Sequence, residues 1–235
     1  GRLRRFAGRV DAFISPSKFS AQTHHERGFQ FPMLHLPNFS KSSSPDLVNA
    51  PPCPHHRPYF LYVGRLEKIK GVQMLLATWD KIPDVDLVIV GTGSDEPEFR
   101  QLAKHNPRIH FVGFVSEAML DTWYRHARAT VVPSLCHEVF PLVCIESLAR
   151  RTPLIARDFG ALAEVIKDSA GGLLYRDEEQ LVTAVRSLVD SPTLRQTLGD
   201  VGHAKYLQDW TPDAHLRKYL ELIERVRLRK VDQKP

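Results

Sequence analysis

Short apolar runs alternate with helical patterns along most of this chain of 235 residues, and that alternation restricts the fold more than any other feature. The runs are rich in Val, Ile and Leu and lie at 59–63, 87–90, 109–112, 129–132, 153–156 and, more weakly, 172–175. Helical patterns separate them at 72–82, 96–105, 117–127, 141–150, 161–166 and 178–189, and continue at about 192–208 and 212–229. Such alternation is typical of a parallel sheet with helices on both faces. We therefore predict an α/β fold with a doubly wound, Rossmann-like parallel sheet and C-terminal helices.

The segment 40–58 divides the chain, because its five prolines and its serine run are incompatible with a regular element. We predict that it is a linker. Residues 1–39 contain two strand candidates, 10–15 and 33–36, around a helix candidate at 18–27. One strand–helix–strand unit is too small to form a domain, so we expect a remnant of a larger N-terminal domain. The sheet domain would then cover 59–210, and 211–235 would form a closing helix.

The composition is that of an ordinary globular protein with a basic surplus. A hydrophobic content of 43% supports a sizeable core, and the net charge of +5 (32 basic minus 27 acidic residues) favours anionic partners. That charge suits nucleotides, phosphates and an anionic membrane face equally, whereas aromatic and basic residues do not interleave as in nucleic-acid stacking platforms. Three cysteines without framework spacing indicate a reducing compartment, and no apolar run approaches the ~20 residues that span a bilayer. We predict a cytoplasmic protein with no nucleic-acid partner, and peripheral binding to the inner membrane face stays open.

Three loops follow strand candidates at their carboxyl ends, the edge where open α/β sheets bind ligands. Gly64 and Arg65 open the first loop, and Lys70 precedes the next helix, so two cations could hold a diphosphate there. The spacing matches neither a Walker A motif nor G-x-G-x-x-G, and a solvated basic loop is the alternative. Gly91 opens the second loop, where a tight turn with positive φ is slightly favoured over close approach of a ligand. The segment 112–115 could offer backbone groups to a base.

Glu138 and Glu146 flank the start of the predicted helix 141–150. Pro141 suits the first turn of that helix, which places Glu138 in the loop and Glu146 in the second turn. At about 1.5 Å rise per residue, Glu146 lies roughly 7 to 8 Å along the axis. Two carboxylates so separated can hold different parts of an elongated polar ligand such as a sugar nucleotide, while the helix N-terminus faces a phosphate.

Other candidate motifs are rejected on position or spacing. Asp84 and Asp86 resemble a cation-binding D-x-D, but they precede the strand 87–90, at the opposite sheet edge, and are interpreted as a polar turn. The cluster of Cys53, His55 and His56 matches no zinc spacing. A nucleophilic pair of Cys136 and His137 is disfavoured because sequence neighbours rarely align.

Together these motifs resemble the C-terminal, donor-binding domain of the retaining GT-B glycosyltransferases of family 4, glycosyl transferases group 1. The resemblance covers about 11–226, and its most specific element is E-x7-E, from Glu138 to Glu146. Supporting elements are Gly64-Arg65 with Lys70-Gly71, the segments 90–93 and 111–115, Gly160 with Glu164, and Trp210. By the same resemblance, 1–39 is the end of the N-terminal, acceptor domain, and the helix in 211–235 returns toward that domain.

The resemblance implies a transferase that moves a hexose from a nucleoside diphosphate sugar to a hydroxyl of a glycan or lipid-linked acceptor, with retention and without an obligatory metal or other cofactor. Arg65 and Lys70 would stabilise the leaving diphosphate, and Glu138 would contact sugar hydroxyls; these three are the implied catalytic residues. The implied donor-binding residues are Gly64, Gly91, Phe114, Val115, Phe140, Leu142, Val143 and Glu146. The chain would be the donor half, which alone binds a nucleotide weakly and transfers no sugar.

The sequence departs from the family pattern at three places. Pro141 stands where the family usually has glycine and removes one backbone donor beside the sugar. Arg151 replaces a glycine where the helix ends, at about 1 kcal/mol if the residue is left-handed, and no glycine follows Asn38. Two alternative functions remain open: a nucleotide-sugar-binding module without turnover, and a GT-B-fold nucleotide-sugar 2-epimerase.

Overall fold

Six strands form one parallel sheet in the order β5-β4-β3-β6-β7-β8. The computed structural model describes residues 9–41 and 52–231 of the chain. The strands are β3 (Tyr59–Val63), β4 (Asp86–Val90), β5 (Ile109–Gly113), β6 (Thr130–Val132), β7 (Leu154–Arg157) and β8 (Gly172–Tyr175). Each lies within one residue of its predicted bounds, and the predicted doubly wound parallel sheet is confirmed.

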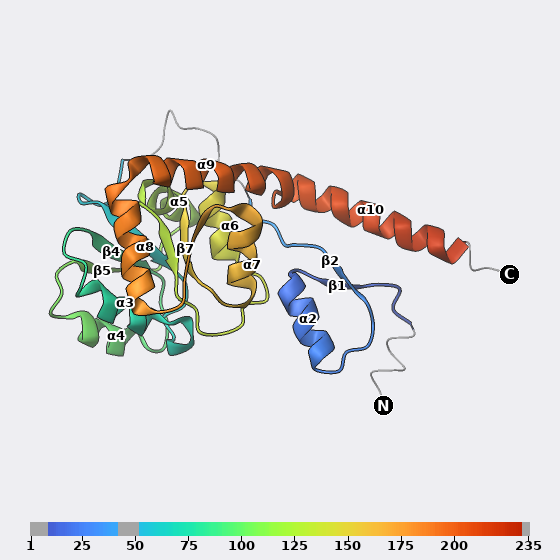
Figure 1. Ribbon diagram of the computed structural model, residues 1–235, viewed down its shortest axis with the longest axis horizontal. Helices are drawn as coiled ribbons and strands as arrows, with labels where there is room; N and C mark the ends of the chain where they lie inside the picture. The colour runs from blue at the N-terminus through green and yellow to red at the C-terminus, as the bar shows by residue number, and fades with distance from the viewer. Residues whose placement is uncertain (1–8, 42–51, 232–235) are drawn as a thin grey trace.

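Helices connect the strands and then close the chain (Figure 1). They are α3 (Val72–Trp79), α4 (Glu96–Ala103), α5 (Glu117–His126), α6 (Leu142–Ala149), α7 (Gly160–Ser169), α8 (Glu178–Asp190), α9 (Pro192–Asp209) and α10 (Pro212–Val231). Side-chain caps fix the starts of four of them, because Ser116, Asp177, Ser191 and Thr211 each accept a bond from a backbone N–H three residues on. Helix α7 runs three residues beyond its predicted end, and Ala170 stops it in a left-handed conformation with φ 51°.

Both faces of the sheet are buried, which explains why the strands are unbroken apolar runs. Side chains alternate along β3: Phe60 and Tyr62 pack with α3, α4 and α8, whereas Tyr59 and Leu61 face the layer that contains α5. Trp79 on α3 meets Phe60 at a ring distance of 5.7 Å, and Trp123 on α5 meets Tyr59 at 5.4 Å. Helices α6, α7 and α9 cover the β6–β7 half of that second face.

A small unit precedes the sheet domain, built from β1 (Phe13–Ser15), α2 (Lys18–Glu26) and β2 (Met33–His35), with β1 and β2 parallel. Figure 1 shows this unit beside α7 and beneath the outer part of α10. Glu164 on α7 accepts from the backbone N–H groups of Lys18 and Phe19, at 2.9 and 2.8 Å. The Ser17 hydroxyl donates to the Val139 carbonyl at 2.7 Å, so the unit contacts the loop beside Glu138.

The linker prediction falls partly on 42–51, which lies outside the described residues, as do 1–8 and 232–235. Residues 52–58 contain bends but no helix or strand. Helices α9 and α10 then follow the sheet domain as two long helices, of which α10 reaches past it (Figure 1). Within the described chain, no helix combines the length and the apolar character that a membrane crossing needs.

Candidate functional site

The strand order reverses between β3 and β6, which are neighbours in the sheet but not in sequence. In open α/β sheets, ligands bind at such a switch point, beyond the carboxyl ends of the strands. The two loops that leave this point run from 64 to 71 after β3 and from 133 to 141 after β6. They contain Arg65, Lys70 and Glu138, so the fold brings the predicted charged residues to the switch point.

Backbone contacts hold the loops in place. Gly71, with φ 76°, lies so close to the β6 loop that a Cβ atom there would be 2.3 Å from the Pro133 carbonyl oxygen. The Leu135 N–H donates to the Ile69 carbonyl at 2.9 Å, and a short 3-10 turn, η2 (Lys68–Lys70), presents the lysine side chain. The first loop is therefore packed against the second along its backbone, and Lys70 is directed at it.

Lys70 and Glu138 form a half-buried ion pair, with Nζ 2.6 Å from Oε1 and side-chain exposures of 20% and 21%. The Ser134 hydroxyl donates to the same Oε1 at 2.7 Å. Both bonds fall on one oxygen, which leaves Oε2 available to a ligand. Cys136 Sγ lies 3.8 Å from Lys70 Nζ and from Glu138 Oε1. The pair is thus fixed before any ligand arrives.

Arg65 lies on the same loop but is held differently. Its Nη1 contacts Glu67 Oε1 at 2.6 Å, and its side chain is 68% exposed. An exposed ion pair of this kind contributes about 0–1 kcal/mol, so the guanidinium can reorient at small cost. The Tyr62 hydroxyl anchors the backbone of the residue, donating to the Arg65 carbonyl at 2.8 Å, and burial raises the pKa of that phenol.

Helix α6 begins one residue later than predicted, because Pro141 (φ −80°, ψ 88°) lies just before it as the N-cap residue. Pro141 has no side-chain hydrogen bond to the helix, and Cys144 N–H bonds back to its carbonyl at 3.0 Å. Glu146 is in the second turn, as predicted. At the other end of the helix, Arg151 adopts φ 57°, which confirms the left-handed conformation expected there.

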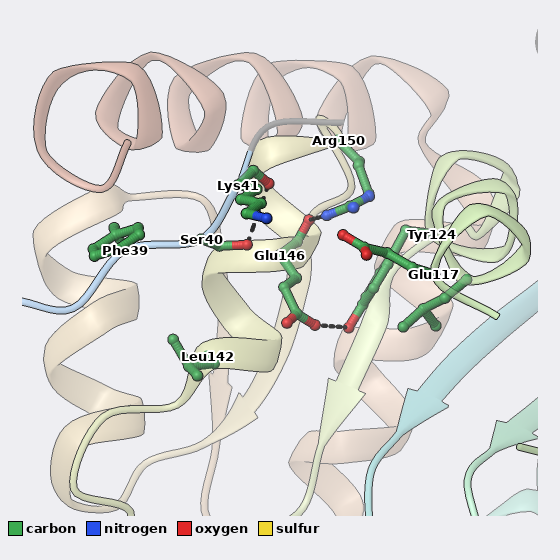
Figure 2. A pocket seen from close by; sticks show the side chains of 9 residues that line it. Phe39, Ser40, Lys41, Glu117, Tyr124, Leu142, Glu146 and Arg150 are labelled. Carbon is green, nitrogen blue, oxygen red and sulfur yellow. Dashed lines mark hydrogen bonds between the residues drawn. The ribbon is translucent and has the colours of Figure 1, made fainter. Parts of the chain in front are cut away.

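Glu146 lines a pocket together with Tyr124 and Arg150 (Figure 2). The buried Tyr124 hydroxyl donates to Glu146 Oε2 at 2.9 Å. The Arg150 side chain is 7% exposed and is held by two hydrogen bonds: Nη1 donates to the Glu146 carbonyl at 2.8 Å, and Nε donates to Asp121 Oδ1 at 2.7 Å. Its guanidinium lies 5.2 Å from the centre of the Tyr124 ring. One oxygen of the Glu146 carboxylate is therefore held, and the other can accept from a ligand.

Burial raises the pKa of Glu146 above its ordinary value, although the Tyr124 hydrogen bond and the Arg150 charge oppose the rise. The nearby Glu117 carboxylate, which lines the same pocket, adds to the increase. A carboxylate kept in a partly desolvated pocket gains from each hydroxyl that donates to it, because a hydrogen bond replaces lost water. The pocket thus favours a ligand with hydroxyl donors at this position.

Three adjoining hollows, of about 460, 280 and 290 Å³, extend along this edge. The first, around Lys70 and Glu138, shares Gly64 and Arg65 with the second and Leu142 with the third. All predicted catalytic and donor-binding residues line one or more of them: Gly64, Arg65, Lys70, Gly91, Phe114, Val115, Glu138, Phe140, Leu142, Val143 and Glu146. The structure brings the whole set together; the role of each residue stays a prediction.

Gly91 owes its identity to packing. Its φ is 132°, and a Cβ atom there would lie 2.0 Å from the Gly64 carbonyl oxygen. This agrees with the favoured interpretation as a turn with positive φ, and it adds a close approach between two backbones. Phe114 beyond β5 is 85% exposed, which leaves one face of its ring available to a planar ligand.

Sequence reasoning missed the residues that support the site, namely Tyr62, Tyr124, Ser134 and Arg150. Their signal is weak, because an aromatic residue or an arginine in a helix or strand pattern, and a serine in a loop, are all ordinary. Of the rejected nucleophile pair, the His137 ring packs against Phe19 at 4.9 Å and Phe159 at 4.6 Å, whereas Cys136 Sγ lies near Lys70 and Glu138. The polar-turn interpretation suits Asp84, which lies in a bend, and is wrong for Asp86, which begins β4 and is 1% exposed.

The fold is a doubly wound α/β domain of the kind found in GT-B glycosyltransferases. The family model for glycosyl transferases group 1 matches residues 57–191, more than half of the sequence, and the chain belongs to this family. The chain is 33% identical over 159 residues to the glycogen synthase of Mycobacterium tuberculosis, across 64% of this chain and 38% of that protein. It is 34% identical over 146 residues to the phosphatidyl-myo-inositol mannosyltransferase of Mycolicibacterium smegmatis, across 57% of this chain and 37% of that protein.

Among solved structures, the sucrose-phosphate synthase of Thermosynechococcus elongatus superimposes with a TM-score of 0.79 and 26% identity, covering 92% of this chain and 58% of that one. The chain thus spans less than two thirds of the length of each of these three proteins. The superposition includes nearly all of this chain, so the arrangement of the sheet and its helices is that of glycosyltransferases.

Proposed function

We propose that this chain supplies the donor half of a retaining hexosyltransferase that takes its sugar from a nucleoside diphosphate sugar. The observation that carries the proposal is the Lys70–Glu138 pair at the switch point, with Arg65 on the same loop and Glu146 one pocket away. Cations at a strand end suit a diphosphate, and carboxylates on either side suit the hydroxyl groups of two sugars.

Each part of the donor then has a partner. Lys70 and Arg65, in place of a metal ion, face the diphosphate; Glu138 accepts from hydroxyls of the transferred sugar through Oε2, and Glu146 accepts from the ribose. Leu142 and Val143 at the start of α6 offer backbone N–H groups to a phosphate. Phe114 and Val115 border the base, and Phe140 and Gly91 complete the walls.

The chemistry that these groups support is departure of the diphosphate. The bond between C1 of the sugar and the phosphate oxygen breaks, and its electron pair leaves with the diphosphate. Fixed cations stabilise that growing negative charge without reorganisation. A hydroxyl of the acceptor then bonds to C1 from the face that the diphosphate leaves, which retains the anomeric configuration, and its proton passes to the departing phosphate.

The relatives indicate the acceptor class only broadly, since one is named a glycogen synthase and another a phosphatidyl-myo-inositol mannosyltransferase. Accordingly, we propose a glycan or lipid-linked hydroxyl acceptor. A transferase is favoured over a binding module without turnover, because the charged residues expected of a transferase are all present: Arg65, Lys70, Glu138 and Glu146.

Donor binding is tested by NMR titration of the chain with UDP, GDP and ADP and their sugars. We expect binding of at least one nucleotide, with Arg65→Ala/Lys70→Ala weakening it by about 10-fold or more per lost charged contact. Lys68→Ala is the matched control, because Lys68 lies in the same turn but pairs with Glu98 at 2.7 Å. No binding of any nucleotide, or equal binding by the double variant, would contradict the site.

Ribose recognition has a separate test. Glu146→Ala should weaken binding of the ribonucleotide more than binding of its deoxyribose analogue, because only the ribonucleotide offers the full set of hydroxyl donors. Equal losses would place Glu146 away from the ribose. Retention is checked in a protein that carries the acceptor site, by comparing the anomeric configuration of donor and product.

A further inference from the structure

Three side chains from separate segments converge at the sheet edge opposite the donor site: His55, Asp86 and His110. The Nε2 atoms of His55 and His110 lie 2.8 and 3.0 Å from the same oxygen, Asp86 Oδ2. All three potential ligand atoms lie within 4.8 Å of one another, and the imidazole centroids are 4.7 Å apart. One carboxylate oxygen thus forms the centre of a compact N, N, O cluster.

The fold fixes this cluster independently of the donor pocket. Asp86 is the first residue of β4, His110 is the second of β5, and His55 precedes β3 by four residues. All three strands are parallel, so these positions share the amino edge. β4 has five residues, and at about 3.3 Å per residue the cluster lies roughly 16 Å from Gly91 at the other edge. A ligand here does not compete with a nucleotide.

The cluster is buried at Asp86 and partly exposed at its two imidazoles. The Asp86 side chain is 1% exposed, whereas those of His55 and His110 are 17% and 37% exposed. Arg57 Nε lies 3.1 Å from the other carboxylate oxygen, Oδ1, as an ion pair without hydrogen-bond geometry. Oδ2 is the oxygen that meets the two imidazoles. A small cation can reach Oδ2 from the imidazole side.

We propose that His55, Asp86 and His110 bind a divalent transition-metal ion, with Zn²⁺ as the probe of choice. Two imidazole nitrogens and one carboxylate oxygen suit Zn²⁺ and its neighbours, whereas Mg²⁺ and Ca²⁺ prefer all-oxygen sets. An ionised carboxylate only accepts hydrogen bonds, so an imidazole that bonds to Asp86 Oδ2 donates from Nε2, whereas coordination by Nε2 requires the proton on Nδ1. Tetrahedral ligation places ligand atoms about 3.3 Å apart, a few tenths of an ångström from the His–Asp distances present.

Metal binding would fasten the segment before β3 to β4 and β5. His55 lies in 52–58, the described end of the predicted linker, so the ion would fix where that linker enters the sheet domain. An ion that binds the folded chain and not the unfolded one raises the melting temperature with concentration. The proposed function neither requires nor excludes this site.

The test is calorimetric titration of the whole chain with Zn²⁺ in metal-free buffer, together with melting temperatures with and without the ion. We expect one ion per chain, and His110→Ala, which removes the most exposed of the three ligands, should weaken binding at least about 10-fold. His56→Ala, the exposed neighbour outside the cluster, and Cys53→Ser, the exposed thiol nearby, should leave the affinity unchanged.

Three results would overturn the proposal. The first is a melting temperature that does not rise with Zn²⁺, and the second is an equal rise with Mg²⁺. The third is a loss of affinity in His56→Ala or Cys53→Ser as large as that in His110→Ala. Asp86→Asn keeps the shape of the buried side chain while it removes the charged ligand and the ion pair with Arg57, so it serves as the second variant if His110→Ala fails to fold.

Discussion

Replacing Tyr124 by Phe removes one hydroxyl from the support of Glu146 and leaves the ring in place. That hydroxyl is buried and donates to Glu146 Oε2 at 2.9 Å. A hydrogen bond to a charged group contributes about 1.5–3 kcal/mol, and one between neutral groups about 0.5–1.5 kcal/mol. We therefore expect Tyr124→Phe to lower the free energy of unfolding by about 1.5–3 kcal/mol when Glu146 is ionised, and by about 1 kcal/mol when it is protonated.

Because the expected loss differs between ionised and protonated Glu146, the effect of Tyr124→Phe on stability depends on pH. Burial raises the pKa of Glu146, so the folded chain binds this proton more tightly than the unfolded chain does. Ionisation of Glu146 consequently removes stability as the pH rises from the ordinary glutamate pKa through the raised one. The Tyr124 hydroxyl opposes that loss of stability. The free energy of unfolding of Tyr124→Phe should therefore drop further below that of the parent chain as the pH rises through this window.

The assay is urea unfolding at a series of pH values from about pH 4, near the ordinary glutamate pKa, upward to about pH 8. Tyr219→Phe on α10 is the matched control, because that ring is 40% exposed, and its effect should stay within about 0.5 kcal/mol. In a Glu146→Gln background, the pH dependence of the Tyr124→Phe effect should disappear. A loss that is independent of pH, or equal to that of the control, would refute this account of how Glu146 is held.

Two backbone substitutions should change stability in opposite directions, both measured by the same urea unfolding. Gly91→Ala should lower the free energy of unfolding by about 2–3 kcal/mol or more. The reason is that φ is 132° and the new Cβ would meet the Gly64 carbonyl oxygen at 2.0 Å. A loss under about 1 kcal/mol would contradict this close approach. Ala170→Gly should raise the free energy of unfolding by about 1 kcal/mol, because the exposed Ala170 ends α7 at φ 51°; a loss of stability would show that the left-handed conformation is not the strained element.

The strands were predictable because burial on both faces leaves a plain signal. A run such as 87–90 has no polar face, so its type and its parallel pairing follow from the apolar run and the helices around it. Helix ends were less predictable. The last residues of α7, Lys167 to Ser169, are polar or charged, and only the backbone conformation at Ala170 shows where the helix stops.

The site followed from the sequence as far as it depends on strand ends. Arg65, Lys70 and Glu138 lie in the loops that follow two strands, and parallel strands bring their carboxyl ends to one edge. The cluster of His55, Asp86 and His110 escaped the same reasoning, because its members lie 31 and 24 residues apart and no spacing rule connects them. The sequence also did not predict the side-chain pairing of Arg65, which pairs with Glu67 and does not join Lys70 around a common anion site.

The two cations at the switch point differ in what a diphosphate must displace. Arg65 leaves an exposed pair that contributes about 0–1 kcal/mol, so it can move to the phosphate at little cost. Lys70 is less exposed and its ammonium has three donors, so it can keep Glu138 and add a phosphate oxygen. In the proposed donor complex, the Lys70 contact to the diphosphate and the Glu138 contact to the sugar would then be coupled through one side chain. For this reason the loss of Lys70 should disturb both ends of the donor, whereas the loss of Arg65 removes a charge from only one.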